Sequence, residues 1–352
     1  MDQELNFFCN KKILITGHTG FKGSWLTTIL KLFGGNILGY SNNNYQNNKT
    51  FYALELNTKV KSIDGCITDL NKLKKTIYKF KPEIVFHLAA QPLVSNSFKD
   101  PYSTFMTNSI GTLNILEILK NCNFIKSCVI ITSDKCYKNK SQFWGYRESE
   151  ELGGDDPYSA SKASAEIFFN SYFKSFFLDR NIGISTVRAG NVIGGGDWSA
   201  DRLIPDFIRS YKSKKPLKIR MPNSTRPWQH VLDPLFGYLL LAKKQFINHK
   251  KYSDNWNFGP DEFSISVKYL LNKFNNYFEN NVQIQIDKKK TFKESQLLQL
   301  NCDKAKFFLG WKPKLNIQET LDYTANWYLS FLNQKVNMYD FTKRQIFNYL
   351  EK

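Results

Sequence analysis

Short runs of almost continuously apolar residues recur through the first half of the chain, and helix-forming stretches separate them. The runs cover residues 12–16, 36–40, 83–88, 127–132 and 184–188. A strand that is apolar on both faces must be covered on both faces, and connecting helices supply that cover when the strands run parallel. The pattern therefore predicts an α/β fold with a doubly wound parallel sheet of the Rossmann type.

A glycine-rich segment directly follows the first predicted strand and opens a helix. Gly17, Gly20 and Gly23 follow the spacing Gly-x-x-Gly-x-x-Gly. Glycines allow a tight turn and let the backbone approach a pyrophosphate, which is bound by the amide groups at the helix N-terminus. This context predicts a dinucleotide site, and we expect the cofactor to be NAD. The second strand, however, runs into Ser41 and Asn42–Asn44 instead of the acid that commonly binds the adenosine ribose, which weakens the preference for NAD over NADP.

The alternation of apolar and helix-forming stretches becomes less regular after about residue 190, where consecutive glycines (194–196) and several prolines occur. We predict an NAD-binding Rossmann domain over residues 1–187, with later segments near 228–260 returning to it. Residues 188–335 are expected to form mainly a smaller mixed α/β substrate-binding domain. Residues 336–352 form a polar, aromatic-bearing C-terminal tail, to which the sequence assigns no role.

Tyr158 and Lys162 form the pattern Tyr-x-x-x-Lys. On a helix this spacing places both side chains on one face, one turn apart. A nearby ammonium favours the tyrosinate and lowers the phenol pKa, so that Tyr158 can take a hydroxyl proton during hydride transfer. Ser133 follows the strand at 127–132, and ligands bind at the carboxyl ends of parallel strands. Ser133 is therefore placed to hydrogen-bond the reacting oxygen.

Asp134 and Lys135 follow Ser133, and a plain dehydrogenase has no evident need for them. An acid and a potential base beside the oxidising tyrosine suggest a second reaction, the elimination of water. Oxidation of a hexose at carbon 4 acidifies the proton on carbon 5. A base then removes that proton while an acid protonates the departing hydroxyl on carbon 6, and the hydride can return to carbon 6.

Seven sequence blocks extend this pattern in order along the chain. They are TGHTGFKGSW (16–25), TSDKCY (132–137), WGYRE (144–148), DPYSASK (156–162), RAGNVIGGGDW (188–198), DRLIPD (201–206) and RPWQHVLDPLFGY (226–238). Together they resemble the nucleotide-sugar 4,6-dehydratases of the extended short-chain dehydrogenase/reductase superfamily, and in particular the branch that acts on CDP-glucose. The resemblance implies deoxysugar biosynthesis for a surface polysaccharide such as the lipopolysaccharide O-antigen.

The resemblance also implies roles for the catalytic residues. Tyr158 would be the oxidation base, supported by Ser133 and Lys162, and Asp134 would be the acid toward the sugar hydroxyl. Lys135 stands where related dehydratases usually carry a glutamate base. Because the reference pKa of lysine is ~10.4, Lys135 is a base only if its surroundings keep it neutral. In the alternative, Lys135 is a cation that stabilises the enolate while another group is the base.

Cofactor and substrate contacts are implied in the same way. Besides Tyr158 and Lys162, the expected cofactor residues are Gly17, Thr19, Gly20, Phe21, Gly23, Asp69, Leu88, Ala89, Gln91 and Asn108. The expected substrate residues are Asn191 beside the hexose and Arg202, Arg226 and His230 at the nucleotide end. Arg188 belongs with the other two arginines, since guanidinium groups suit paired phosphates. The alternatives are a helix cap for Asp69, a salt bridge for Arg202, a structural role for His230, and core packing instead of base stacking for Trp198 and Trp228.

Composition restricts the partners and the compartment. The chain has 49 Lys and Arg against 31 Asp and Glu, a net charge of +18, but only 8 of the 49 are Arg while Asn numbers 34. Lysine-rich, arginine-poor composition is typical of a genome-wide bias, and we expect no nucleic-acid partner. No stretch reaches the ~18 apolar residues of a membrane helix, no signal peptide is visible, and the six Cys and four His lack metal-ligand spacing. We expect a cytoplasmic homo-oligomer, a dimer or tetramer, that binds no metal.

Two other classes of function stay open. Another nucleotide-sugar 4,6-dehydratase or a 4-epimerase of the same fold would share the sheet and the Tyr-x-x-x-Lys pair. A non-enzymatic protein that senses nicotinamide or binds nucleic acid is the weakest alternative, because the full catalytic set is present.

Overall fold

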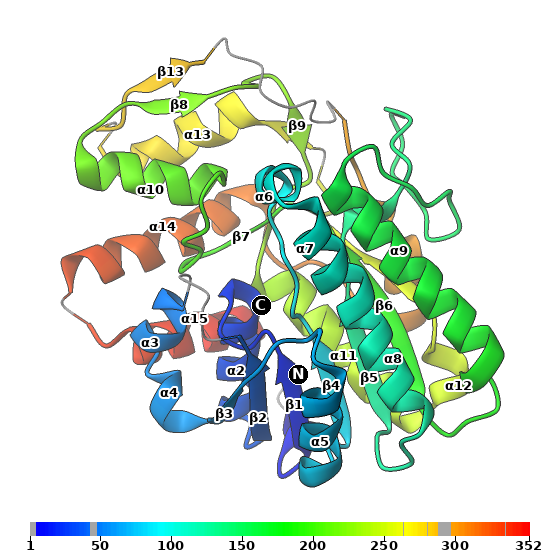
Figure 1. Ribbon diagram of the computed structural model, residues 1–352. Helices are drawn as coiled ribbons and strands as arrows, with labels where there is room; N and C mark the ends of the chain where they lie inside the picture. The colour runs from blue at the N-terminus through cyan, green and yellow to red at the C-terminus, as the bar shows by residue number, and fades with distance from the viewer. Residues whose placement is uncertain (1–4, 43–47, 263, 280, 288–296, 335) are drawn as a thin grey trace.

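The computed structural model describes residues 5–42, 48–262, 264–279, 281–287, 297–334 and 336–352. Its centre is a seven-stranded parallel sheet in the order β11-β6-β5-β4-β1-β2-β3 (Figure 1). The strands are β1 (Lys12–Thr16), β2 (Asn36–Ser41), β3 (Lys61–Asp64), β4 (Ile84–His87), β5 (Ser127–Ile131), β6 (Gly183–Ala189) and β11 (Asn255–Phe258). The predicted Rossmann-type sheet is confirmed.

Apolar side chains of the strands form one core on each face of the sheet. In β1, Ile13 and Ile15 pack into one core and Leu14 into the other, because successive strand residues point to opposite faces. Helices α2 (Phe21–Leu32) and α11 (Leu232–Ile247) cover the first face, and α5 (Leu70–Phe80), α8 (Gly111–Lys120) and α9 (Pro157–Tyr172) cover the second. Short helices complete the connections: α3 (Lys49–Ala53), α4 (Leu56–Lys59), α6 (Val94–Lys99), α7 (Pro101–Phe105) and α12 (His249–Tyr252).

A smaller group of elements lies at the top of Figure 1, beyond the sheet. It contains α10 (Leu203–Ser213), β8 (Leu217–Ile219), β9 (Thr225–Arg226), β12 (Ile265–Ser266), α13 (Val267–Asn276) and β13 (Ile284–Ile286), with α14 (Ile317–Asn333) below them. β8 pairs with β13, β9 pairs with β12, and β7 (Val192–Ile193) pairs with β10 (Gln229–His230). Within the predicted return segment, β11 pairs with β6 in the large sheet.

Residues 336–352 contain the helix α15 (Met338–Glu351), which packs against α2 and α14. Ile346 and Tyr349 are buried in this contact. The Tyr349 hydroxyl donates to Asp233 Oδ1 at 2.8 Å, and the Lys314 ammonium donates to the Tyr349 carbonyl at 3.2 Å. The C-terminal segment is therefore a docked helix. Lys314, from outside the helix, donates to a carbonyl group that the last turn of the helix leaves open.

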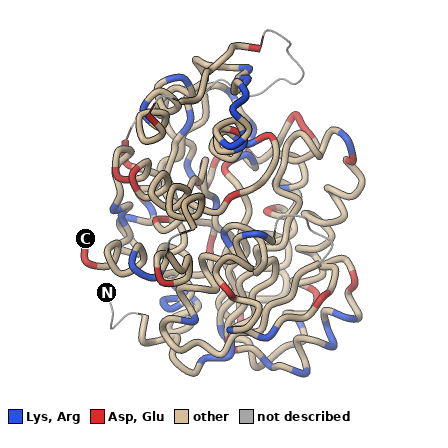
Figure 2. The backbone as a smooth tube through the Cα atoms, turned by 90° about the vertical axis from the view of Figure 1, so that its left-hand side faces the viewer, with Lys and Arg blue, Asp and Glu red and all other residues tan. Residues whose placement is uncertain are grey.

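Three features of the structure bear on the partners of the protein. Among the residues that it describes, no helix is long and apolar enough to cross a membrane, and no group of three His, Cys, Asp or Glu side chains is placed to hold a metal. Lys and Arg positions are scattered along the chain in the view of Figure 2, with Asp and Glu between them.

Side chains from three helices hold the glycine run at 194–196 in place. Trp25 Nε1 donates to the Gly195 carbonyl at 2.9 Å, Thr50 donates to the Gly196 carbonyl, and the Tyr328 hydroxyl donates to the Asp197 carbonyl at 2.5 Å. The Trp327 ring lies directly over Gly195, where an added Cβ would come within 2.0 Å of it. Only glycine fits at this position.

We therefore expect Gly195→Ala to destabilise the protein by about 1–3 kcal/mol or more, the usual cost of overpacking a core. The measurement is urea denaturation followed by circular dichroism. Gly153→Ala is the matched control, because its nearest contact would be Lys138 Cβ at 3.3 Å. Equal stability of the two variants would show that the Trp327 ring leaves room for a Cβ on residue 195.

Candidate active site

The glycine loop joins β1 to α2 and packs against the carboxyl end of β4. Gly17 has φ +72°, and a Cβ there would lie 2.7 Å from the Ala89 amide nitrogen. A Cβ on Gly23 would lie 2.1 Å from the Gly17 carbonyl oxygen. Gly20 is the N-cap of α2. The loop thus brings the start of α2 and the predicted contact Ala89 to one edge of the sheet, with the helix amides open to an anion.

The end of β2 carries hydroxyl groups and an imidazole in place of an acid. His18 Nδ1 lies 2.8 Å from Ser41 Oγ, and His18 Nε2 lies 2.8 Å from Ser62 Oγ. Burial lowers the pKa of His18 to about 4, so the ring is neutral at pH 7. Asn43 and Asn44 lie outside the described residues. Asp69 caps α5 by accepting from the Lys72 amide at 2.9 Å, which is the structural alternative; its contact with adenine stays a prediction.

Gln91 and Asn108 bind each other. The Gln91 backbone N–H donates to Asn108 Oδ1 at 2.8 Å. Asn108 Nδ2 donates to the Gln91 backbone carbonyl at 3.0 Å and to Ser161 Oγ at 2.9 Å. The Asn108 side chain is buried and its amide is committed to these bonds. The geometry fits a role in holding the loop after β4 against α9 better than the predicted direct contact with the cofactor.

The predicted catalytic residues gather where β5 ends. Ser133 Oγ donates to Asp134 Oδ1 at 3.0 Å, and Lys135 Nζ lies 3.4 Å from the same oxygen. The Asp134 side chain is 1% exposed, and its Oδ2 has no hydrogen-bond partner among the described residues. From α9, Lys162 Nζ donates to the Ile131 carbonyl at 3.2 Å. One oxygen of Asp134 is therefore engaged within the protein while the other is open to a ligand.

The protonation of the Tyr158–Lys162 pair differs from the prediction. Burial raises the pKa of Tyr158 to about 12, and Asp134 adds to the increase; a hydrogen bond from Ser133 and the charge of Arg202 oppose it. The prediction of a lowered phenol pKa therefore does not hold in the protein without ligands, because desolvation of the tyrosinate outweighs nearby positive charge. Burial also lowers the pKa of Lys162 to about 8, against the opposing charge of Glu166.

Arg188 is buried in an ion pair, so the prediction that it binds a diphosphate is wrong. Its Nη2 lies 2.7 Å from Glu166 Oε2, with side-chain exposures of 1% and 0%. Its Nη1 donates to the Tyr137 hydroxyl at 2.7 Å. Glu166 also accepts from Thr132 Oγ1 at 2.5 Å and from Thr186 Oγ1 at 2.8 Å. Glu166 was not predicted as a site residue, although it follows Lys162 by four residues and so lies on the same face of α9.

The residues predicted at the hexose and the diphosphate occupy different environments. Asn191 Oδ1 is buried and has no partner among the described residues, as expected of a group that awaits a ligand. Arg202 Nη1 lies 2.9 Å from Asp197 Oδ2, so the salt-bridge alternative is present, while a third of the Arg202 side chain stays exposed. Arg226 is buried, and its Nη1 donates to the Thr225 carbonyl at 2.8 Å.

His230 lies in the interior. Its ring makes edge contacts with Trp25 and Tyr323 at centroid distances of 5.7 and 5.4 Å, and Nδ1 accepts from the Leu232 amide at 3.3 Å. Burial lowers the pKa of His230 to about 3. Because the side chain is fully enclosed, the structure favours the structural role over contact with a nucleotide. Trp198 and Trp228 likewise pack into or against the core.

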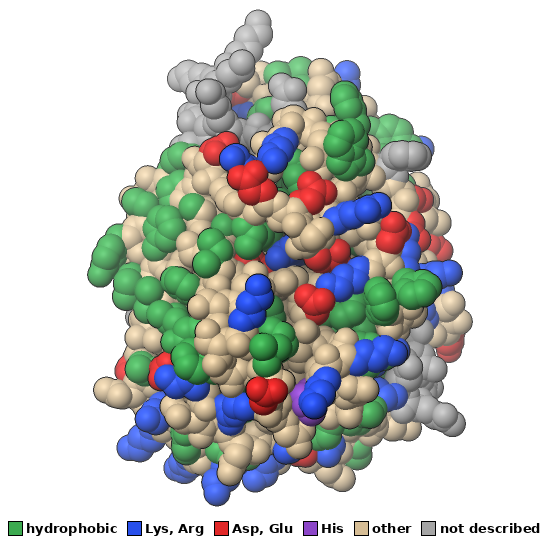
Figure 3. All heavy atoms as spheres, turned by 90° about the vertical axis from the view of Figure 1, so that its right-hand side faces the viewer, with side chains coloured by type: hydrophobic (Ala, Val, Ile, Leu, Met, Phe, Trp, Pro, Cys, Tyr) green, Lys and Arg blue, Asp and Glu red, His purple; other side chains and the backbone are tan. Residues whose placement is uncertain are grey.

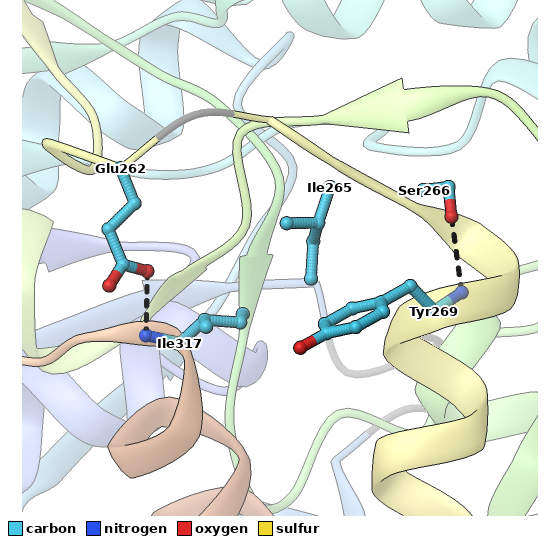
Figure 4. Close-up of a pocket in the computed structure, with 5 residues that line it drawn as sticks. All are labelled: Glu262, Ile265, Ser266, Tyr269 and Ile317. Carbon is cyan, nitrogen blue, oxygen red and sulfur yellow. Dashed lines mark hydrogen bonds between the residues drawn. The ribbon is translucent and has the colours of Figure 1, made fainter.

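A separate hollow of about 470 Å³ lies between α13 and α14 (Figure 4). It is lined by Glu262, Ile265, Ser266, Tyr269 and Ile317. Glu262 Oε2 accepts from the Ile317 amide at 2.9 Å, and Ser266 Oγ accepts from the Tyr269 amide at 3.2 Å. Both polar groups therefore serve helix N-termini, and none of the predicted site residues lines this hollow.

Comparison with known proteins agrees with this geometry. A CDP-glucose 4,6-dehydratase of Salmonella typhimurium is 43% identical over 351 residues, which cover 98% of each chain. Among solved structures, an epimerase of Methanothermobacter thermautotrophicus has a TM-score of 0.82 at 23% identity and covers 94% of this chain and 96% of its own. The dTDP-glucose 4,6-dehydratase of Bacillus anthracis in complex with NAD has a TM-score of 0.76 at 22% identity, with coverage of 91% and 97%.

The parallel sheet, the glycine loop and the Tyr158–Lys162 pair beside Ser133 define an enzyme of the extended short-chain dehydrogenase/reductase class. Its sequence matches the model of one family over residues 14–324. The chain belongs to this family, which is described as GDP-mannose 4,6 dehydratase.

Proposed function

We propose that the protein is an NAD-dependent CDP-glucose 4,6-dehydratase, which converts CDP-D-glucose to CDP-4-dehydro-6-deoxy-D-glucose and water. The observation that carries the proposal is the Asp134–Lys135 pair held against Ser133 at the end of β5. The 43% identity to the Salmonella dehydratase, which extends over 98% of each chain, supports the choice of CDP-glucose.

The oxidation step belongs to Tyr158, Ser133 and Lys162. The glycine loop and the start of α2 would hold NAD, which would supply a hydride acceptor for carbon 4 and a hydride donor for carbon 6. Tyr158 takes the proton of the carbon 4 hydroxyl, and Ser133 holds the reacting oxygen. Because burial keeps Tyr158 protonated in the protein without ligands, its deprotonation depends on the arrival of substrate and cofactor. Lys162, one helical turn away, is the cation that stabilises the tyrosinate.

The elimination step belongs to Asp134 and Lys135. In its protonated form, Asp134 gives the proton on Oδ2, an oxygen with no hydrogen-bond partner among the described residues, to the departing hydroxyl on carbon 6, which leaves as water. Lys135 removes the proton from carbon 5 in its neutral form. Asn191, Arg202 and Arg226 are proposed to hold the substrate, the first at the hexose and the others at the nucleotide end. In this proposal residues 1–187 bind mainly the cofactor and residues 188–335 mainly the substrate.

The base role of Lys135 gives a first test. We expect Lys135→Met to stop the exchange of the carbon 5 proton with solvent deuterium, measured by NMR of CDP-glucose and product in D₂O. Lys138→Met is the control, since Lys138 pairs with Glu151 at the surface. Unchanged exchange in Lys135→Met would assign the base to another group and leave Lys135 as a cation that stabilises the enolate.

The choice of nucleotide has its own experiment. The purified protein is incubated separately with CDP-glucose, dTDP-glucose, UDP-glucose and GDP-mannose, and the 4-keto product is followed by its alkaline absorbance. We expect turnover of CDP-glucose. Turnover of another nucleotide sugar alone would favour a different 4,6-dehydratase, and a 4-epimerised product would favour an epimerase of this fold, such as the Methanothermobacter structure.

We also propose a homodimer formed through the outer face of α7 and α9. Large apolar side chains are exposed on these helices (Tyr102, Phe105 and Ile167) and on the segments next to them in sequence (Phe98 on α6 and Phe176 just after α9). Hydrophobic side chains gather on the left of Figure 3, the side on which these helices lie. Such patches are typical of interfaces between protein copies. The proposed reaction takes place in the cytoplasm, which suits six free thiols, and supplies a deoxysugar for a surface polysaccharide.

A further inference from the structure

Lys22 lies near the predicted catalytic residues at the carboxyl edge of the sheet, which we call the catalytic edge. Neither the oxidation nor the elimination uses Lys22. It is the second residue of α2, two positions after the N-cap Gly20. The side chain is partly buried, and its ammonium forms no hydrogen bond or ion pair with the residues that the structure describes. A lysine without a carboxylate partner in the first turn of a helix is also opposed by the positive end of the helix dipole. The position is therefore unfavourable for a cation unless an anion is bound.

Four charged groups act on the Lys22 ammonium, and three of them are positive. Arg202 has the largest effect, followed by Lys162, and Lys135 adds a smaller one; Asp134 is the only negative group. These residues come from three separate parts of the chain, so the fold concentrates positive charge near Lys22. Asp134 offsets only part of this charge, because it supplies one negative charge against three positive ones.

Burial and these positive neighbours lower the pKa of Lys22 to about 7. The charge of Lys22 is coupled both to Arg202, which is proposed to hold the nucleotide end, and to Lys162, which lies beside the reacting tyrosine, and an anion bound at Lys22 would remove this repulsion. The proposed substrate carries its diphosphate between its nucleoside and its hexose. The cofactor also carries a diphosphate, but the backbone amides of the glycine loop already serve that group.

We propose that the Lys22 ammonium contacts the diphosphate of the sugar nucleotide and is a specificity-determining residue for it. This inference rests on the proposed function. It adds a contact from the cofactor-binding half of the chain to the anchoring arginines of the second half. Substrate would then be held by residues from both halves of the chain, with its hexose directed toward Asp134 and Lys135.

One consequence is a change of protonation on binding. At pH 7.5 an amine with a pKa near 7 is mostly neutral, and contact with a diphosphate raises its pKa. Binding should therefore take up about half to three-quarters of a proton per site. The other groups that face Lys22 are Arg202, Lys162, Lys135 and Asp134. Burial lowers the pKa of Lys162 to about 8, so Lys162 is expected to add to the uptake at this pH.

The test uses the NAD-loaded enzyme and CDP-glycerol, whose diphosphate is fully esterified and has no proton to lose near pH 7. Calorimetric titration in two buffers of different ionisation enthalpy gives both the affinity and the proton uptake. We expect Lys22→Met to weaken binding about 10-fold or more and to remove most of the uptake. Lys22→Arg, which keeps the charge, should bind within about threefold of the wild type and also lack the Lys22 share of the uptake. Lys31→Met, at the exposed end of the same helix, is the control.

Steady-state kinetics with CDP-glucose and NAD affinity complete the test. Lys22→Met should raise KM about 10-fold with kcat within about threefold, and NAD affinity should stay within about twofold. Wild-type affinity and uptake in Lys22→Met would overturn the proposal, and equal loss of NAD and CDP-glycerol binding would assign the contact to the cofactor instead. Failure of the wild-type enzyme to convert CDP-glucose would instead overturn the proposed function.

Discussion

Tyr158→Phe is expected to lower kcat for CDP-glucose by two to four orders of magnitude, roughly the range that a positioned acid–base group contributes. The substitution removes only the phenolic oxygen, so the packing of this buried ring on α9 is retained. Without that oxygen, no group near Ser133 takes the proton of the carbon 4 hydroxyl, and neither the ketone nor the later elimination can form. The measurement is the initial rate of 4-keto product formation at saturating substrate.

Tyr172→Phe is the matched control for this experiment. Tyr172 lies on the same helix, but its hydroxyl donates to Glu117 at 2.9 Å, away from the site. It should leave kcat within about twofold of the wild type. A Tyr158→Phe enzyme that keeps more than a tenth of wild-type kcat would remove Tyr158 from the role of oxidation base.

Glu166→Gln is expected to lower the free energy of unfolding by about 3–5 kcal/mol, the cost of leaving one member of a buried ion pair uncompensated. Glu166 accepts from Arg188, Thr132 and Thr186, and neither charged side chain of the pair is exposed. A neutral amide keeps the volume but leaves the Arg188 guanidinium buried without a counter-charge. The double variant Glu166→Gln/Arg188→Met should recover part of the loss, because it removes the orphaned charge.

The pair also gives stability a pH dependence of known sign. Burial raises the pKa of Glu166, but the charge and hydrogen bond of Arg188 outweigh it and hold the pKa below the ordinary value of 4.5. This contribution is fully present above the unfolded-state pKa and is lost as the pH falls through the folded-state pKa. Urea denaturation at pH 7 and pH 4 measures both effects.

Glu117→Gln is the control for the buried pair, because the Glu117–Lys120 ion pair is about one-third exposed on each side. Surface pairs of this kind contribute ~0–1 kcal/mol. A Glu166→Gln variant that unfolds within about 1 kcal/mol of wild type at pH 7 would show that the buried network does not hold the catalytic edge together.

The sequence predicted the sheet because its apolar runs coincide with β1, β2, β4, β5 and β6, where burial on both faces leaves a clear pattern. The edge strand β3 was missed because Lys61, Ser62 and Asp64 are polar and exposed. The strand return of β11 could be anticipated, but not that residues 336–352 form a docked helix. A short amphipathic segment takes its structure from the partner it packs against.

Local spacing predicted which side chains the catalytic edge brings together, and long-range pairing decided what each of them does. Ser133, Asp134 and Lys162 meet because a strand end and a helix turn are short-range features. Arg188 suits a phosphate or a carboxylate equally well, and only the fold shows that Glu166 is its partner. The burial of His230 beneath α2 and α14 is likewise a property of tertiary packing.

In the proposed reaction, the site oxidises carbon 4, eliminates water and returns the same hydride to carbon 6. The most direct measurement uses CDP-glucose that carries deuterium on carbon 4, with the product analysed by NMR and mass spectrometry. We expect a 4-keto-6-deoxy product with the deuterium on carbon 6. Deuterium that stays on carbon 4 of an epimerised sugar, or that is absent from a dehydrated product, would contradict it.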